Sequence, residues 1–459
     1  MTIPEVFVIS YFILTLSFGF YKKSSHDLQS FLFAGRKLTL PSLVATIVST
    51  WYGGILEIGR FTYNNGIVTW IIFGLFYYIA ALFFIKFIAP RIIDLKVPTL
   101  PELFYISYGR TPALITIFCI LLIASPAPYL KIFSELSTYL WDISKFNAVL
   151  IGIFLSTIYA FQGGFSAIIR TDKLQFILMF MGFLLLFYHC YNTFGGFSFL
   201  KNNTPNYAFN IPGNLNFKFI FIWGFISLVT FIDPSFYQRT FSGSSIKTVQ
   251  KSILVSIFFW FIFDFLTVIT GLYALAILPG INTNPYLDLA QLILSPIALG
   301  LFIVSLFAIV MSTIDSFSFI SSYTIGRDLI FIINNYKKRE NILFIRLGLL
   351  ITAALSIILT TYFNYAIDIW YICGSIAIPC LLFPLITILY GINIKNFTAF
   401  MLFPMIVSIL WHFHGVVSSY NSDYIKYFYD IDPMYPGLLL SGVLFYLFKK
   451  DRYFLYKAH

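Results

Sequence analysis

Four polar side chains lie on one face of an otherwise apolar segment between residues 298 and 327. Ser312, Asp315 and Ser316 stand at positions i, i+3 and i+4, and Ser305 lies one heptad earlier, so a helix aligns all four. Hydroxyl and carboxylate oxygens are hard ligands, which suit Na⁺ rather than a soft metal. A lone serine usually bonds the carbonyl four residues before it, but the adjacent Ser312-Thr313 pair beside a carboxylate favours a cation site.

Further ionisable groups lie in or beside apolar segments, where such groups usually mark ion or solute paths. Asp172 opens the segment 166–192 and is either a helix-terminal carboxylate favoured by the helix dipole or part of an ion site. Asp264 lies within an aromatic run, where a structural hydrogen bond is expected. Glu57 and Arg60 are one helical turn apart and form either an intrahelical pair or a solute contact.

Two apolar segments contain helix-breaking sequences near their middle. Residues 49–54 (STWYGG) interrupt the segment that begins near Pro41, and residues 230–235 (TFIDPS) interrupt the one that begins near Phe217. Each opens a run of five spans, and this odd number gives the two runs opposite orientations. Unwound backbone inside a bilayer needs a polar partner, and matched interruptions in inverted halves are typical of the binding site of a secondary transporter.

The elements that position these groups are indicated by the composition. Of 459 residues, 59% are hydrophobic and 10% are charged, and the mean hydropathy is +0.86. Soluble domains carry about 25% charged residues, so a cytosolic enzyme, a DNA-binding module and a secreted disulfide scaffold are excluded. A membrane helix needs about 20 apolar residues. Thirteen apolar runs are found, at 3–21, 41–61, 66–90, 112–140, 146–162, 166–192, 217–238, 250–279, 298–327, 343–363, 367–390, 396–414 and 434–449.

The net charge of +10 is interpreted as a sign of membrane orientation rather than of nucleic-acid binding. Most basic residues gather in alternate loops and in the tail 449–457. The remaining loops hold only Arg60, Lys131, Lys145, Lys201, Lys218 and Lys426. The positive-inside rule therefore predicts a multi-pass protein of the inner (cytoplasmic) membrane, with its N-terminus outside and its C-terminus in the cytoplasm.

Several short motifs occur in order along the chain. They are residues 31–36 (FLFAGR), 163–164 (GG), 171–175 (TDKLQ), 237–239 (YQR) and 311–313 (MST). This ordered set resembles the sodium:solute symporter family over about residues 30–390. The resemblance implies an all-α polytopic fold with a leucine-transporter-type core of five plus five inverted helices. Its units are then 1–40 (an extra helix and a cytoplasmic loop), 41–192 and 217–390 (the two repeats), 193–216 (an external loop) and 391–459 (two helices and a basic tail).

The resemblance also implies which residues bind sodium. The main site uses the carbonyls of Ser49, Tyr52 and Ile309 and the hydroxyls of Ser312 and Thr313. Some relatives carry a second site, which here maps to Asp172, Ser312, Asp315 and Ser316. Asp315 stands where those relatives usually have serine, and two carboxylates in one site would hold either a cation or a proton.

The solute is expected between the two interruptions and the later segment 367–390. The candidate residues are Trp51, Leu56, Glu57, Trp223, Ser227, Thr230, Trp370, Tyr371 and Ser375. The sugar-transporting relatives have amides where this chain has Leu56 and Ile226, which argues against a hexose. A small amino acid or an organic anion suits an aromatic pocket with few polar groups.

The leading hypothesis is sodium-coupled uptake of a small organic solute by alternating access, with Na⁺ as the only metal. The expected partners are the solute, sodium and the lipid bilayer, with no nucleic acid, for a chain that is monomeric or weakly oligomeric. One alternative is proton coupling through Asp172, Asp315 or Asp264. Another is an intramembrane enzyme or a non-transporting solute sensor, but the sequence has no catalytic cluster and no appended signalling domain.

Overall fold

The computed structural model describes residues 1–21, 27–95, 97–280, 284–334, 341–362, 366–418 and 427–453. Lys426 and the end of the basic tail, which the orientation argument uses, lie outside these residues. The described chain is almost entirely helical, and ten of its segments are long and apolar enough to cross a membrane. A polytopic helical membrane fold is therefore confirmed.

Helices follow one another along both halves of the described chain. The first half contains α1 (Ile3–Phe20), α2 (Leu28–Phe33), α3 (Leu40–Trp51), α4 (Ile55–Asn65), α5 (Val68–Trp70), α6 (Phe76–Phe83), α7 (Ala89–Leu95), α8 (Leu100–Tyr108), α9 (Arg110–Ile123), α10 (Ala127–Leu140) and α11 (Lys145–Phe194). The second half contains α12 (Phe197–Asn203), α13 (Phe217–Ile226), α14 (Pro234–Ser242), α15 (Ile246–Ile277), α16 (Pro285–Ile293), α17 (Pro296–Tyr323), α18 (Ile330–Ile333), α19 (Ile342–Tyr362), α20 (Ala366–Leu389), α21 (Phe397–Ser418) and α22 (Met434–Phe448).

Shorter turns and two strands complete the described chain. Segments of π-helix at Ile71–Leu75, Phe84–Ile88 and Thr324–Leu329 continue α5, α6 and α17, and 3₁₀ turns lie at Ala34–Arg36, Asn206–Phe209, Ser227–Phe231 and Phe428–Asp430. Strands β1 (Ile392–Ile394) and β2 (Lys449–Tyr453) pair antiparallel. The start of the predicted basic tail is thus part of a small sheet.

Each of the thirteen predicted runs overlaps a helix, but thirteen remains a prediction as a number of spans. Among the described residues, α11 joins two of the runs, and α3 and α22 are shorter than a full span. Within α11, Gly164 has φ 56° and ψ −152°, a backbone conformation that few residues other than glycine adopt. A Cβ there would lie 2.5 Å from the Phe31 carbonyl oxygen, so a glycine is required where the two halves of α11 meet.

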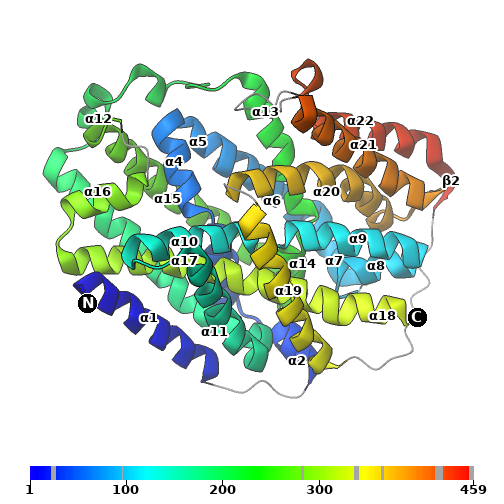
Figure 1. Cartoon of the computed structure of the whole chain (residues 1–459). Helices are drawn as coiled ribbons and strands as arrows, with labels where there is room; N and C mark the ends of the chain where they lie inside the picture. The colour runs from blue at the N-terminus through cyan, green and yellow to red at the C-terminus, as the bar shows by residue number, and fades with distance from the viewer. Residues whose placement is uncertain are drawn as a thin grey trace.

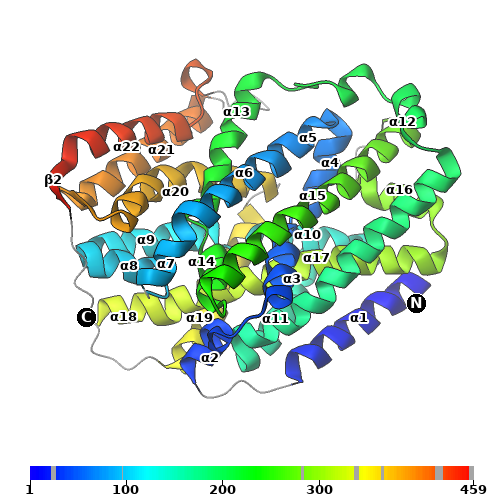
Figure 2. The same ribbon diagram turned by 180° about the vertical axis from the view of Figure 1, so that it is seen from behind.

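The centre of the molecule is α17. Every residue from Phe302 to Tyr323 in this helix is buried, including the polar side chains of its serine and aspartate face. It packs against α1, α3, α10, α11 and α19. Figures 1 and 2 show α17 in the interior, with α1 along one edge and α21 and α22 on the opposite side.

The structure also contains an interruption that the sequence did not predict. The run 112–140 is divided between α9, which ends at Ile123, and α10, which begins at Ala127. Pro126 and Pro128 flank the start of α10, and a proline disfavours helical backbone in the residue before it. This break turns Tyr129 toward the same region as the two predicted interruptions.

Candidate ion and solute site

The first interruption is three residues long and tightly packed. Helix α3 ends at Trp51 and α4 begins at Ile55. A Cβ on Gly53 would lie 2.6 Å from the Thr313 side chain, and one on Gly54 would lie 2.0 Å from the Trp370 ring. Only glycine permits such approaches, so the interruption is held between α17 on one side and α20 on the other.

The hydroxyls of α17 meet the end of α3. The Thr313 hydroxyl lies 2.9 Å from the Thr50 carbonyl oxygen and 3.3 Å from the Ile309 carbonyl oxygen. The Ser312 hydroxyl lies 2.9 Å from the hydroxyl of Ser49. The structure thus brings together four of the five residues predicted to bind sodium. Tyr52, the fifth, lies in the adjacent interruption, and its side-chain hydroxyl donates to the Trp260 carbonyl at 3.0 Å.

Asp172 lies in the interior beside these residues. Its carboxylate accepts hydrogen bonds from the hydroxyls of Thr46 and, at 2.7 Å, Ser312. A positively charged side chain also lies nearby: Nη2 of Arg239 in α14 is 4.0 Å from Oδ2 of Asp172. Both side chains are at least 97% buried. A buried charge needs a partner, and the guanidinium of Arg239 compensates the negative charge of the Asp172 carboxylate.

Arg239 also contacts Ser316, one of the residues that the resemblance assigns to a second cation site. Its Nη2 donates to the Ser316 hydroxyl at 2.9 Å and to the Thr50 hydroxyl at 2.7 Å. Its Nε donates to the Thr46 carbonyl at 3.3 Å. A guanidinium therefore lies between Asp172 and Ser316. The YQR motif was noted in the sequence, but its arginine was not among the predicted site residues.

Asp315 faces a different part of the interior. Its carboxylate accepts a hydrogen bond from Tyr159 of α11. Among the described residues, no hydrogen bond or ion pair joins Asp315 to Asp172 or Ser316. The four residues predicted to share the second site are thus divided, with Asp172, Ser312 and Ser316 in one network and Asp315 in another. Ser305, on the same face, donates to the Phe302 carbonyl at 2.6 Å and packs against Gly182.

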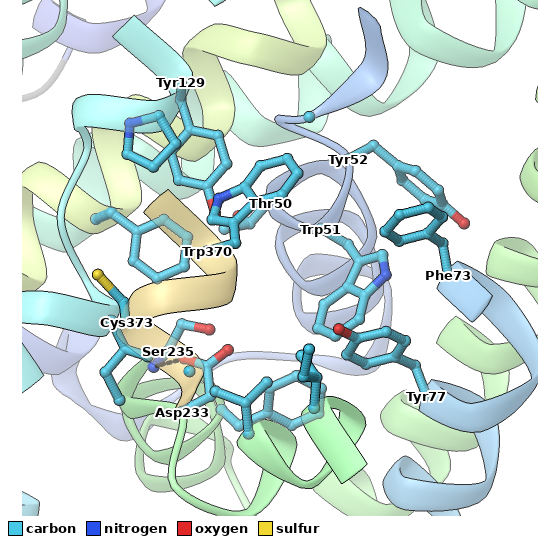
Figure 3. A pocket seen from close by; sticks show the side chains of 18 of the residues that line it. Thr50, Trp51, Tyr52, Phe73, Tyr77, Tyr129, Asp233, Ser235, Trp370 and Cys373 are labelled. Carbon is cyan, nitrogen blue, oxygen red and sulfur yellow. Dashed lines mark hydrogen bonds between the residues drawn. The ribbon is translucent and has the colours of Figure 1, made fainter. Parts of the chain in front are cut away.

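A cavity of about 170 Å³ lies between the interruptions. Figure 3 shows Trp51 and Tyr77 on one side of it, Tyr129, Trp370 and Cys373 on another, and Asp233 with Ser235 below. The Trp51 and Tyr77 rings are 5.0 Å apart, and those of Tyr129 and Trp370 are 5.8 Å apart. The walls are therefore largely aromatic, with few polar groups.

The solute candidates from the sequence divide into two groups. Trp51, Trp223 and Trp370 line the cavity. The six others are not among its lining residues. Glu57 pairs with Arg60 at 3.1 Å, Ser227 donates to the Gly224 carbonyl at 2.7 Å, and Tyr371 donates to Asp432. Leu56, Thr230 and Ser375 are buried elsewhere.

The cavity also contains residues that sequence reasoning did not assign to it, among them Phe73, Tyr77, Tyr129, Asp233 and Ser235. Asp233 caps α14, since its carboxylate accepts from the Ser235 backbone N–H at 2.7 Å. The Asp-Pro pair that marks the second interruption could have indicated this cap. Asp264 also lines the cavity and accepts a hydrogen bond from Tyr78, the structural bond that its position suggested.

The comparisons with known proteins agree with this arrangement. The model of the sodium:solute symporter family matches residues 31–407. The chain belongs to this family. Its relatives include the sodium/proline symporter of Haemophilus influenzae, 27% identical over 382 residues and 72% of each chain. The sodium/proline symporter of Staphylococcus aureus (strain Newman) is 23% identical over 97% of this chain and 92% of the relative.

Solved structures confirm the fold of the symporter. A substrate-bound, outward-open Na⁺-coupled sialic acid symporter superposes with a TM-score of 0.80 at 18% identity, covering 98% of this chain and 99% of that one. An Eremococcus coleocola manganese transporter gives 0.53 at 13% identity, with 92% and 93% covered. The predicted leucine-transporter-type fold is thus confirmed. Sodium-coupled secondary transport is the activity class of this chain, and its family and fold are those of transporters.

Proposed function

We propose that this symporter carries a small organic solute together with Na⁺ into the cell, as a monomeric or weakly oligomeric protein that catalyses no chemical reaction. The carbonyls of Ser49, Tyr52 and Ile309 and the hydroxyls of Ser312 and Thr313 bind the ion. The contact of the Thr313 hydroxyl with the Thr50 carbonyl, at 2.9 Å, carries the proposal. It brings α17 hydroxyls against the unwound end of α3, where oxygen atoms can surround a hard cation.

Binding of sodium favours one state of the transporter. The cation takes over the carbonyls at the end of α3 and links them to the hydroxyls of α17, which holds the broken helix in place and completes the solute site. We place the N-terminus outside the inner membrane and the C-terminus in the cytoplasm, on the charge distribution of the loops. The membrane potential then contributes about 2.3 kcal/mol per charge per 100 mV to inward movement.

We further propose that the solute is a small, largely apolar amino acid such as proline. The relatives named sodium/proline symporter support this, and so do the aromatic walls of a cavity of about 170 Å³. The Asp233 carboxylate at the cavity offers a partner for an amino group. A sugar acid presents many hydroxyls, and the three tryptophans provide few groups with which to bond them.

The ion assignment is tested by uptake into proteoliposomes. The Ser312→Ala/Thr313→Ala variant is expected to raise the sodium concentration for half-maximal uptake by at least about tenfold, which corresponds to about 1.4 kcal/mol. Ser305→Ala, on the same helix face, is the matched control and is expected to leave that concentration unchanged. An unaltered sodium dependence in the double variant contradicts the assignment.

The choice of coupling ion and solute is tested in the same vesicles. Proline uptake is expected with an inward sodium gradient and not with a pH gradient alone. Uptake driven by the pH gradient without sodium supports the proton-coupled alternative through Asp172, Asp315 or Asp264. Competition by unlabelled proline, and none by sialic acid, is expected for the proposed solute class.

A further inference from the structure

The segment that leads into α22 meets α20 beside the solute cavity. We name this segment, residues 427–433, the clasp. Its Asp432 carboxylate accepts a hydrogen bond from the hydroxyl of Tyr371 on α20, and the ring of its Tyr427 stacks on the Tyr371 ring at 6.5 Å. The sequence suggested Tyr371 as a solute contact, but it is not among the residues that line the cavity. Its partners lie in the clasp instead.

The clasp is itself attached to both C-terminal helices. The Nε1 of Trp411 on α21 donates to the Ile431 carbonyl at 2.7 Å, and Nδ1 of His412 lies 2.9 Å from the Tyr427 hydroxyl. Helix α22 begins at Met434, directly after the clasp. Both α21 and α22 also pack against α20, as Figure 1 shows. The carboxylate that Tyr371 meets is therefore part of a well-connected unit.

Prolines divide α20 into two parts. Pro379 and Pro384 lie inside this helix. Because proline has no N–H, Pro379 cannot donate to the Ser375 carbonyl, which weakens the connection between residues 366–378 and the rest of α20. Helix α22 packs at this point, since a Cβ on Gly437 would lie 2.9 Å from the Pro379 side chain. The first part of α20 is thus held by α22 at one end and by the clasp near the other.

This first part of α20 forms one wall of the solute cavity. Trp370 and Cys373 both line the cavity, as Figure 3 shows. A Cβ on Gly54 would lie 2.0 Å from the Trp370 ring, and the Tyr129 ring is 5.8 Å from it. Tyr371 follows Trp370 directly, and successive side chains on a helix point about 100° apart. A bond that fixes Tyr371 therefore fixes the orientation of Trp370.

We propose that Asp432 is a positioning residue for transport: the hydrogen bond that it accepts from Tyr371 keeps the first part of α20 in place and sets where Trp370 stands in the cavity wall. Helices α21 and α22 lie beyond both predicted repeats, and this bond gives them a part in solute binding. The inference rests on the proposed function in one point, which is that the solute occupies this cavity.

A natural cysteine reports on the cavity wall without knowledge of the solute. The chain has four cysteines. Cys119, Cys190 and Cys380 are buried, whereas Cys373 is partly exposed and lines the cavity. The test is the rate at which a small methanethiosulfonate reagent modifies Cys373 in the purified full-length protein in detergent. Mass spectrometry identifies each modified thiol.

Loss of the bond is expected to open the wall. Asp432→Ala and Tyr371→Phe are each expected to speed the modification of Cys373 at least about fivefold, the effect of one hydrogen bond on a local equilibrium. The double variant is expected to match either single variant, because all three lack the same bond. Asp430→Asn is the control. It removes an exposed carboxylate of the clasp, keeps a residue that tolerates the left-handed backbone there, and is expected to leave the rate unchanged.

General unfolding is distinguished from the proposed effect, because it also exposes the three buried thiols. If Asp432→Ala exposes them, Tyr371→Phe, which retains the ring, decides the question. An unchanged Cys373 rate in Tyr371→Phe, or rate increases that multiply in the double variant, overturns the proposal.

Transport gives a second measurement. In proteoliposomes, Asp432→Ala and Tyr371→Phe are each expected to raise the proline concentration for half-maximal uptake severalfold. A wild type that takes up no proline refutes the proposed solute, and the modification rates of Cys373 then decide on the clasp by themselves.

Discussion

Asp172 of α11 and Asp315 of α17 are both fully buried carboxylates, and their surroundings differ in one respect. Asp172 accepts from Thr46 and Ser312 and lies 4.0 Å from the guanidinium of Arg239. Asp315 accepts from Tyr159, and its remaining neighbours are the neutral side chains of Ser156 and Gln175. Asp172 thus has a cationic partner within the protein, whereas among the described residues no ion pair involves Asp315.

The two carboxylates also join different parts of the fold. The partners of Asp172 come from α3, α14 and α17, which include both interrupted helices. Asp315 is connected through Tyr159 to α11. The Asp172 network therefore links the interrupted helices to each other, whereas the Asp315 bond links the two long helices α11 and α17.

The largest expected effect comes from removal of the cation beside Asp172. Arg239→Leu leaves the buried carboxylate uncompensated and is expected to lower the free energy of unfolding by about 3–5 kcal/mol, measured by SDS titration in mixed micelles. The Arg239→Leu/Asp172→Asn double variant removes both charges and is expected to recover a large part of that loss. Equal losses in the single and double variants contradict the pairing.

A smaller loss is expected at Asp315. Tyr159→Phe removes the hydrogen bond to Oδ2 and is expected to cost about 1–3 kcal/mol in sodium-free buffer. Because Ser156 and Gln175 remain beside the carboxylate, the loss is expected to stay below that of Arg239→Leu. The measurement is the same SDS titration, and a loss as large as that of Arg239→Leu counts against the comparison.

A third variant examines how fully Asp172 is satisfied. Thr46→Val removes one hydroxyl donor, but Ser312 and Arg239 remain beside the carboxylate. The expected cost is about 1 kcal/mol, measured by the same SDS titration, with no change in the response to sodium. A cost as large as that of Arg239→Leu would mean that the hydroxyl, not the guanidinium, carries the compensation.

The smallest effect is expected at Ser305. Its hydroxyl bonds a carbonyl of its own helix, and alanine leaves the helix and its packing against Gly182 in place. Ser305→Ala is expected to change the free energy of unfolding by less than about 0.5 kcal/mol. A larger change would show that the whole polar face of α17, and not only the part near the carboxylates, is energetically coupled.

Helical periodicity explains what could be predicted from the sequence. The i, i+3, i+4 pattern predicts that Ser312, Asp315 and Ser316 lie near one another on α17. The glycine pair at residues 53–54 marks the interruption between α3 and α4, whose backbone packs against α17. Both features depend on neighbours within one segment. Family motifs then supplied the fold, because their order along the chain carries information that no single segment holds.

The division between the two carboxylates could not be predicted in the same way. Asp315 is one turn from Ser312 along α17, but which neighbouring helix each side chain meets depends on how α1, α3 and α11 pack around it. Arg239 lies on a helix 67 positions beyond Asp172 in the chain, and no local pattern connects them. Tyr129 was missed for a similar reason, since the break at residues 124–126 was interpreted as part of one span.

The adjacent glycines of the first interruption have a consequence for energetics. Gly53 lies against Thr313, which belongs to the proposed ion site, and Gly54 lies under the Trp370 ring at the wall of the solute cavity. A single peptide unit therefore separates the contact with the ion site from the contact with the solute cavity. By thermodynamic reciprocity, the factor by which the solute tightens sodium binding must equal the factor by which sodium tightens solute binding. Replacing either glycine by a larger residue is therefore expected to weaken this coupling, so that sodium and solute each affect the affinity of the other less.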